Sequence, residues 1–163
     1  MKKIISVKTA LKVLENIRKK NKIVVLTGGC FDILHVGHIR FLSKAKKQGD
    51  YLFLLLENDK TVKKLKGFNR PINSQKERAE VLAALSFVDY VVLLEEMKNN
   101  NDYDKLISAL RPNIIATTKD DPQAIHNLRQ AKEINAKVSF VTNRIKNRST
   151  TLLAEIISKN FSK

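Results

Sequence analysis

The chain has 163 residues, of which 43% are hydrophobic and 29% charged, and it carries a formal net charge of +15. This length suits one domain with a full core, while the single cysteine, Cys30, excludes an internal disulfide and agrees with a reducing compartment. No apolar run approaches the roughly 20 residues of a membrane-spanning helix, and no signal-peptide pattern follows Met1, so we expect a cytoplasmic protein without a membrane partner.

Helical and strand-like segments alternate along the chain. Apolar residues recur at helical spacing after Ser6, a suitable N-cap, and predict an N-terminal helical extension within residues 1–20. Short continuous apolar runs predict five strands in a core of residues 21–158, at residues 23–26, 51–56, 90–94, 114–116 and 138–141. Further helices are predicted at residues 38–48, 74–85, 104–110, 122–134 and 150–158, with a basic connection at residues 60–67.

Continuous apolar strands are typical of a parallel sheet that helices cover on both faces. We therefore predict an α/β fold, a single Rossmann-like, doubly wound domain over residues 1–163 with a five-stranded parallel sheet. Ligands bind such sheets beyond the carboxyl ends of the strands, where the strand order reverses. The residues that directly follow each strand are therefore the candidates for a functional site.

The first predicted core strand leads into a segment with two glycines and two histidines. Gly28 and Gly29 allow backbone N–H groups to approach a phosphate closely, and His35 and His38 flank Gly37 at the expected start of a helix. Imidazoles, free amides and a helix N-terminus are the groups that stabilise an anionic phosphoryl transition state. Two other interpretations stay open, a metal pair completed by Cys30 or Asp32 and a purely structural pair of histidines.

This segment resembles the nucleotidyltransferases with an H-x-G-H signature, which His35-Val36-Gly37-His38 matches in full. Residues 28–50 look like the cytidylyltransferase-like branch, which includes glycerol-3-phosphate cytidylyltransferase and archaeal-type FAD synthetase. The likeness is greatest to the adenylyltransferase domain of the bifunctional ADP-heptose synthesis enzyme, through Leu65-Lys66-Gly67, Arg70-Pro71-Ile72-Asn73, Glu77-Arg78 and apolar segments at residues 81–85 and 88–92. The resemblance covers roughly residues 20–157.

The resemblance implies three groups of site residues. The catalytic residues would be His35, His38 and Lys66, the lysine closing over the triphosphate. The nucleotide-binding residues would be Thr27, Gly28, Gly29, Cys30, Phe31, Gly37, Arg78, Ser149, Thr150 and Thr151. The substrate-binding residues would be Asp32, Arg70 and Asp120, and no protein metal site is expected.

Several of these residues have plainer interpretations. Arg78 is equally compatible with a surface arginine, Arg70 with an anchor for its loop, and Asp32 with a partner for loop amides, a histidine or a magnesium-bound water. The hydroxyls of residues 149–151 suit an N-cap as well as a phosphate site. Lys63 and Lys64 stay undecided between phosphate binding and a solvated basic segment.

The chain also departs from the family pattern. Glu57 stands where the relatives usually have a small or amide side chain, and Thr117-Thr118-Lys119-Asp120 matches a Lys-Gly-Gly-Asp segment only at Asp120. Asn147-Arg148 replaces a Gly-Ile pair, whereas Arg144 matches an arginine of the cytidylyltransferases. The changes at residues 117–119 and 147–148 leave the nucleotide and the acceptor open, but not the class of reaction.

The resemblance implies transfer of AMP from ATP to a phosphorylated sugar similar to a heptose 1-phosphate, with release of pyrophosphate and with Mg²⁺ bound mainly through the triphosphate. A CTP-dependent enzyme acting on glycerol 3-phosphate or another polyol phosphate is the main alternative. An FAD synthetase-like enzyme and a non-catalytic nucleotide- or RNA-binding module are the others. The positive charge favours anionic partners or reflects a biased composition, and the sequence has no basic stretch interleaved with aromatic residues that favours nucleic acid. Dimers are common among the relatives, so a homodimer is an open expectation.

Overall fold

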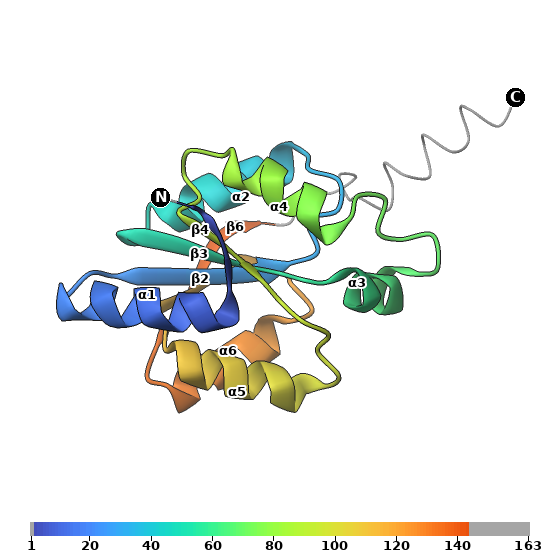
Figure 1. Ribbon diagram of the computed structural model, residues 1–163. Coiled ribbons are helices and arrows are strands. Elements are labelled where there is room, and N and C mark those ends of the chain that lie inside the picture. Colours follow the sequence, from blue (N-terminus) through green and yellow to red (C-terminus); the bar gives the residue numbers. More distant parts are fainter. Residues whose placement is uncertain (1, 144–163) are drawn as a thin grey trace, which may run out of the picture.

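A computed structural model describes residues 2–143 as a parallel sheet with helices on both faces (Figure 1). The strands are β1 (Ile4–Ser6), β2 (Val24–Gly29), β3 (Tyr51–Leu56), β4 (Tyr90–Leu93), β5 (Ile114–Lys119) and β6 (Lys137–Asn143). The helices are α1 (Val7–Lys19), α2 (Val36–Lys46), α3 (Asp59–Lys66), α4 (Gln75–Ala83), α5 (Asn100–Leu110) and α6 (Ala124–Glu133). The helix predicted at residues 150–158 lies outside the described residues. No helix within residues 2–143 is long and apolar enough to cross a membrane.

The strand order is β1-β4-β3-β2-β5-β6, and every neighbouring pair is parallel. From β2 the chain moves outward through β3 to β4 and then returns to the other side of β2 to form β5 and β6. The strand order therefore reverses between β2 and β5, and α2 begins directly beyond the carboxyl end of β2. This is the position at which doubly wound folds bind their ligands.

The prediction of an α/β fold with a parallel sheet is confirmed, but the prediction of five strands is wrong, because residues 2–143 already form a sheet of six. The additional strand, β1, pairs with β4 from Ile4 opposite Val91 to Ser6 opposite Leu93. Three residues are too few to show a strand period, and the partner strand lies far away in the sequence. Ser6 then caps α1 by accepting from the N–H of Thr9, as its position predicted.

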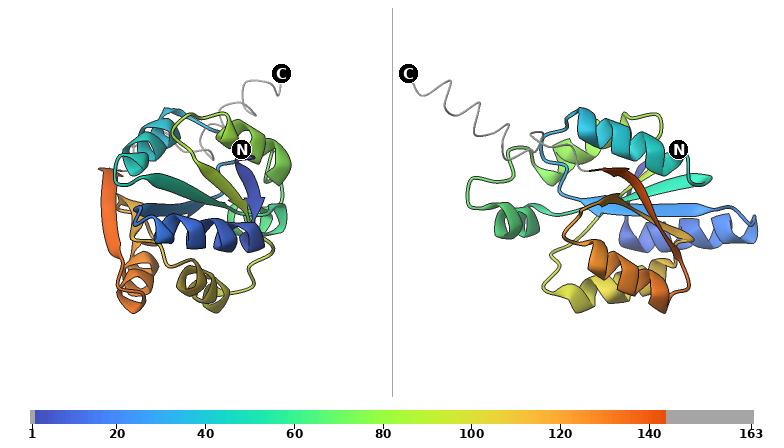
Figure 2. Two further views of the ribbon diagram at one scale, coloured as in Figure 1. Left: turned by 60° about the vertical axis from the view of Figure 1, so that its left-hand side comes forward. Right: turned by 180° about the vertical axis from the view of Figure 1, so that it is seen from behind.

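Both faces of the sheet are buried, as the continuous apolar runs predicted. Along β3, Leu52, Leu54 and Leu56 pack with residues of α2 and α4, whereas Phe53 and Leu55 pack on the opposite side with residues of α1, α5 and α6. Figure 2 shows the two helical layers on either side of the sheet. The rigid sheet thus holds the carboxyl ends of its strands in fixed positions beside the start of α2.

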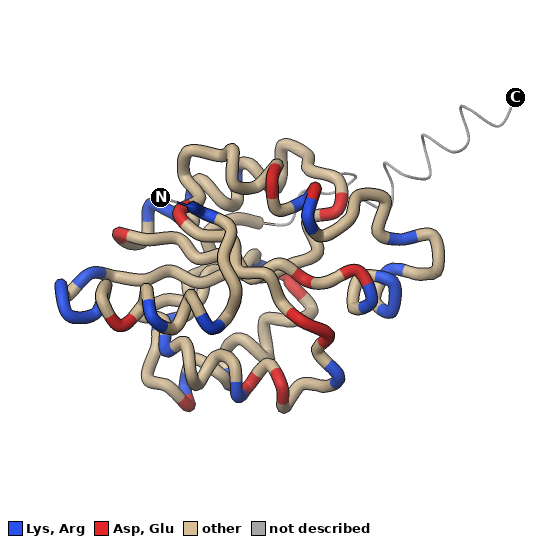
Figure 3. Tube along the Cα trace, viewed as in Figure 1, with Lys and Arg blue, Asp and Glu red and all other residues tan. Residues whose placement is uncertain are grey.

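The connection expected at residues 60–67 is the helix α3 (Asp59–Lys66) in the structure. The side chain of Asn58 accepts from the N–H of Thr61 at 2.8 Å and begins the helix, and Gly67 ends it with a φ of 103°. Thr61 and Val62 are buried, while the lysines that follow are exposed. The helix stands at the carboxyl edge of the sheet and brings basic residues there (Figures 1 and 3).

Candidate active site

The two histidines of the H-x-G-H segment form the first turn of α2. His35 is the N-cap residue, and its Nδ1 accepts the backbone N–H of Gly37 at 3.1 Å. Nδ1 of His38 accepts the backbone N–H of His35 at 3.3 Å, and the two ring centroids lie 3.9 Å apart. Because Nδ1 of each ring accepts a hydrogen bond, the proton of each neutral imidazole lies on Nε2. The site thus has two Nε2–H donors side by side.

The charge of this pair is set by its surroundings. Burial, together with the neighbouring His35, lowers the pKa of His38 from 6.5 to about 4. His38 is therefore neutral at physiological pH, and its ring carries an N–H donor without a permanent charge. The N-terminus of α2 adds its partial positive charge at the same place.

A hollow of about 180 Å³ lies beside the first turn of α2, lined by Gly37, Arg40, Lys44, Thr142 and Asn143. Its lining combines the glycine of the signature, two cationic side chains and the end of β6. The predicted nucleotide-binding residue Gly37 therefore borders an open, positively charged space. Arg40 and Lys44 were not predicted as site residues, because they resemble any solvent-facing helix positions in the sequence.

The glycine segment ends β2 and then turns toward α2. Thr27 is buried within the strand, and Gly28 and Gly29 are its last two residues. Phe31 has a positive φ of 45°, is buried, and packs its ring 5.3 Å from that of His38. A Cβ at Gly29 would lie 2.9 Å from the Phe31 ring, closer than such atoms approach. Gly29 is thus needed to let Phe31 pack against the catalytic candidate His38.

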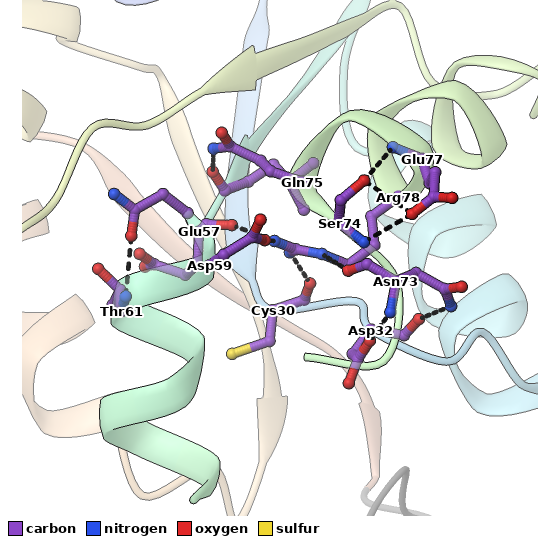
Figure 4. A network of polar contacts seen from close by, with 12 residues as sticks. Cys30, Asp32, Glu57, Asp59, Thr61, Asn73, Ser74, Gln75, Glu77 and Arg78 are labelled. Carbon is purple, nitrogen blue, oxygen red and sulfur yellow. Dashed lines mark hydrogen bonds and ion pairs between the residues drawn. The ribbon is translucent and has the colours of Figure 1, made fainter. Parts of the chain in front are cut away.

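Arg78 lies in a different environment from the one expected of a phosphate-binding residue. Its side chain is 0% exposed and donates to the carboxylate of Asp59 at 2.7 Å. It also donates to three backbone carbonyls, those of Cys30, Glu57 and Asn73 (Figure 4). The guanidinium therefore ties together the loops after β2 and β3 and the segment before α4. These contacts favour a role of Arg78 in positioning the loops, because its Nε, Nη1 and Nη2 all donate to protein groups, and its contact with a nucleotide stays a prediction.

Asp32 and Arg70 form a second buried link between loops. Nε of Arg70 lies 2.5 Å from Oδ2 of Asp32, and the two side chains are 9% and 2% exposed. The Asp32 carboxylate also accepts the backbone N–H groups of Ile72 and Asn73, and the Asn73 side chain donates to the Asp32 carbonyl. Of the interpretations offered by the sequence, the structure favours loop anchoring for Asp32 and Arg70. The role of Asn73 was missed, although it lies within the Arg70–Asn73 segment.

The lysines of α3 differ in their surroundings. Lys63 stacks over the ring of Phe68 at 3.9 Å, and Lys64 donates to the carbonyl of Lys98 at 3.5 Å. Lys66 is exposed at the end of the helix, near enough to Cys30 for its charge to oppose the burial that raises the pKa of that thiol. Among the α3 lysines, Lys66 is therefore the one whose charge acts on Cys30 in the glycine segment.

The remaining predicted site residues fall into two sets. Asp120 is exposed, with a positive φ of 68°, in the turn between β5 and α6 at the carboxyl edge of the sheet. Ser149, Thr150 and Thr151, and also Arg144, lie outside the described residues. Within residues 2–143, no group of three His, Cys, Asp or Glu side chains is arranged to hold a metal ion, and Asp32 is bound to Arg70 instead.

The fold and the histidine pair define a class of enzyme, the nucleotidyltransferases, in which a Rossmann-like sheet presents an H-x-G-H segment at a helix start. A family model described as cytidylyltransferase-like matches residues 26–162. The chain therefore belongs to the cytidylyltransferase-like family, as the sequence motifs indicated.

Similar proteins support this membership. The chain is 40% identical over 150 residues to the bifunctional protein HldE of Syntrophotalea carbinolica, covering 91% of this chain and 30% of that protein. It is 50% identical over 123 residues to the FAD synthase of Thermococcus sibiricus, covering 74% of this chain and 80% of that protein. The crystal structure of a lipopolysaccharide core biosynthesis protein from Thermoplasma volcanium superposes with a TM-score of 0.62 at 27% identity, covering 76% of this chain and 97% of that one. The chain thus spans less than a third of that HldE protein.

Proposed function

We propose that this protein transfers AMP from ATP to a phosphorylated sugar similar to a heptose 1-phosphate and releases pyrophosphate. The observation that carries the proposal is the capping of α2 by His35 and His38, which places the proton of each ring on Nε2 at the helix start. Donors fixed in advance at a helix N-terminus stabilise the charge that develops on a transferring phosphoryl group.

The proposed reaction is a direct displacement at the α-phosphorus. An anionic oxygen of the acceptor phosphate attacks, the bond from the α-phosphorus to the bridging oxygen breaks, and pyrophosphate leaves in line. Because the attacking oxygen is already ionised, no general base is required. His35 and His38 would donate to the oxygens between the α- and β-phosphates, and Lys66 with residues 149–151 would hold the outer phosphates.

Residues 2–143 offer no group of three metal-ligating side chains here, so we expect Mg²⁺ to bind together with the triphosphate. Asp32, the carboxylate nearest the glycine segment in the chain, accepts from Arg70, Ile72 and Asn73 and so offers no free ligand set. Mg²⁺ is commonly held by substrate phosphates and water with few protein ligands. When bound, the ion would neutralise part of the phosphate charge.

The choice of nucleotide and acceptor is supported by the relatives. One carries the name FAD synthase, an enzyme whose product contains an adenine nucleotide, and another is named as the bifunctional protein HldE. The FAD synthase favours adenylyl transfer by its name, and the match to HldE agrees with the resemblance to the adenylyltransferase domain of the bifunctional ADP-heptose synthesis enzyme. The family description, cytidylyltransferase-like, favours the second candidate, transfer of CMP from CTP to glycerol 3-phosphate or another polyol phosphate.

The test is pyrophosphate release from ATP, CTP, GTP or UTP with Mg²⁺, each paired with heptose 1-phosphate, glycerol 3-phosphate and FMN. Release from ATP with heptose 1-phosphate alone is the expected result. Release from CTP with glycerol 3-phosphate would replace the proposal by the second candidate. No release from any pair, together with no shift of the melting temperature by any triphosphate, would overturn both candidates.

A further inference from the structure

Glu57, which follows β3, and Thr61, in the first turn of α3, each have a buried polar atom that no group of the described residues satisfies. Within residues 2–143, Oε2 of Glu57 and Oγ1 of Thr61 are the buried side-chain atoms that lack a hydrogen-bond partner. Glu57 is 8% exposed and Thr61 is 5% exposed. Folded proteins satisfy nearly all such atoms, because leaving one unpaired in the interior is costly. Two of them only four positions apart in the chain point to a missing hydrogen-bonding partner there.

Glu57 occupies a position next to the proposed site of reaction. It directly follows β3, and its backbone N–H donates to the carbonyl of Gly29 at 3.2 Å. Its charge also contributes to the raised pKa of Cys30, which places the carboxylate near the glycine segment. Figure 4 shows Glu57 with Cys30 and Arg78 in one polar network. An acceptor that approaches the end of β2 would therefore pass close to this carboxylate.

The fold makes use of only part of the Glu57 side chain. Oε1 accepts from the hydroxyl of Tyr103 at 2.9 Å, and Arg78 donates to the Glu57 backbone carbonyl rather than to the carboxylate. Burial accordingly raises the pKa of Glu57, although Tyr103 and Arg78 act in the opposite direction. A glutamine would keep the bond to Tyr103 without burying a charge. The second carboxylate oxygen is thus unexplained by packing or by the hydrogen bonds of the described residues.

We propose that Glu57 is a specificity-determining residue that accepts a hydrogen bond through Oε2 from a hydroxyl group of the phosphorylated acceptor, and that the hydroxyl of Thr61 contacts the same molecule. This inference rests on the proposed function and extends it by naming a protein residue that contacts the acceptor molecule. A buried acceptor atom that a substrate hydroxyl satisfies selects strongly against an analogue without that hydroxyl, because the analogue leaves the protein atom unpaired.

The experiment compares the acceptor that gives pyrophosphate in the panel above with its singly deoxygenated analogues. Wild-type protein and Glu57→Gln, Thr61→Val, Tyr103→Phe and Glu80→Gln variants are assayed for kcat/KM of each acceptor, KM of ATP and melting temperature. Glu80→Gln is the matched charge control, because Glu80 is exposed on α4. Tyr103→Phe removes the bond to Oε1 but leaves Oε2 in place.

We expect one deoxygenated analogue to lose about 10- to 100-fold in kcat/KM with the wild-type protein, the range for a hydrogen bond to a charged group. In Glu57→Gln this discrimination should fall to within about threefold, because an amide N–H₂ group replaces the carboxylate oxygen Oε2 that accepts the hydrogen bond. The KM of ATP should stay within about twofold of the wild-type value. Tyr103→Phe and Glu80→Gln should retain the discrimination. Thr61→Val should weaken it, by less than Glu57→Gln.

Equal discrimination by wild type and Glu57→Gln would overturn the inference while leaving the proposed function intact. A lower melting temperature shared by Glu57→Gln and Tyr103→Phe, with unchanged discrimination, would assign the carboxylate to the fold instead. If no acceptor reacts with the wild-type protein, the proposed function fails and this inference fails with it.

Discussion

The backbone N–H of His35 donates to Nδ1 of His38, while Nδ1 of His35 accepts the N–H of Gly37, so that the two imidazoles and the first turn of α2 hold one another in place. The arrangement satisfies N–H groups at the helix start and at the same time fixes the tautomer of both rings. The same hydrogen bonds therefore cap the helix and orient the two imidazoles that we propose as catalytic donors.

Replacing His38 by alanine should reduce kcat by about 100- to 1,000-fold, because a preorganised donor to the transition state is lost. The assay is pyrophosphate release with the triphosphate and acceptor identified above. His126→Ala is the matched control, since His126 lies within α6 and away from the paired histidines. Near-normal turnover by His38→Ala would contradict the assignment of this residue.

The free energy of unfolding should depend on pH through His38. Its pKa is about 4 in the folded protein and 6.5 without the fold, so between these values the unfolded chain binds a proton that the folded one does not. Stability contributed by the neutral ring is therefore present above pH 6.5 and lost as the pH falls toward 4, by about 3 kcal/mol. Urea unfolding of wild type and His38→Gln at a series of pH values measures this difference. Parallel pH curves for the two proteins would refute it.

Arg78→Ala should lower the free energy of unfolding by about 3 kcal/mol, because three carbonyls and the carboxylate of Asp59 lose a buried partner. Arg129→Ala, which breaks exposed ion pairs with Asp104 and Glu133, should lower the free energy of unfolding far less, because solvent screens these charges. Chemical denaturation measures both changes. If Arg78→Ala kept its stability and raised only the KM of the triphosphate, Arg78 would bind phosphate after all.

Gly29→Ala should be more destabilising than Gly28→Ala. The added methyl group at Gly29 meets the buried Phe31 ring at 2.9 Å, whereas at Gly28 the nearest atom, Cβ of Leu55, lies at 3.5 Å, an ordinary contact. Displacing Phe31 from a packed site should cost about 1–3 kcal/mol. Melting temperatures of the two variants test this, and equal values would show that Phe31 moves aside freely.

Much of the fold could be predicted, because most of its strands are recognisable from their local sequence. The runs at residues 51–56 and 90–94 are apolar throughout, and the alternation of strands and helices leaves few topologies. The strand β1 and the helix α3 were missed for physical reasons. β1 exists only through its pairing with β4, and α3 shows a long exposed basic surface that resembles a solvated connection.

The sequence alone determined the doubly wound class, the histidine pair and the glycine segment, because these depend on residue type and on spacing within one stretch of chain. The tertiary structure decided which charged groups are available to a ligand. Arg78, Arg70 and Asp32 look like binding residues in the sequence, yet each has partners on segments up to 48 positions away, while Glu57 keeps one buried oxygen unpaired within the described residues. Burial and hydrogen-bond satisfaction depend on contacts between distant segments, and no local pattern records them.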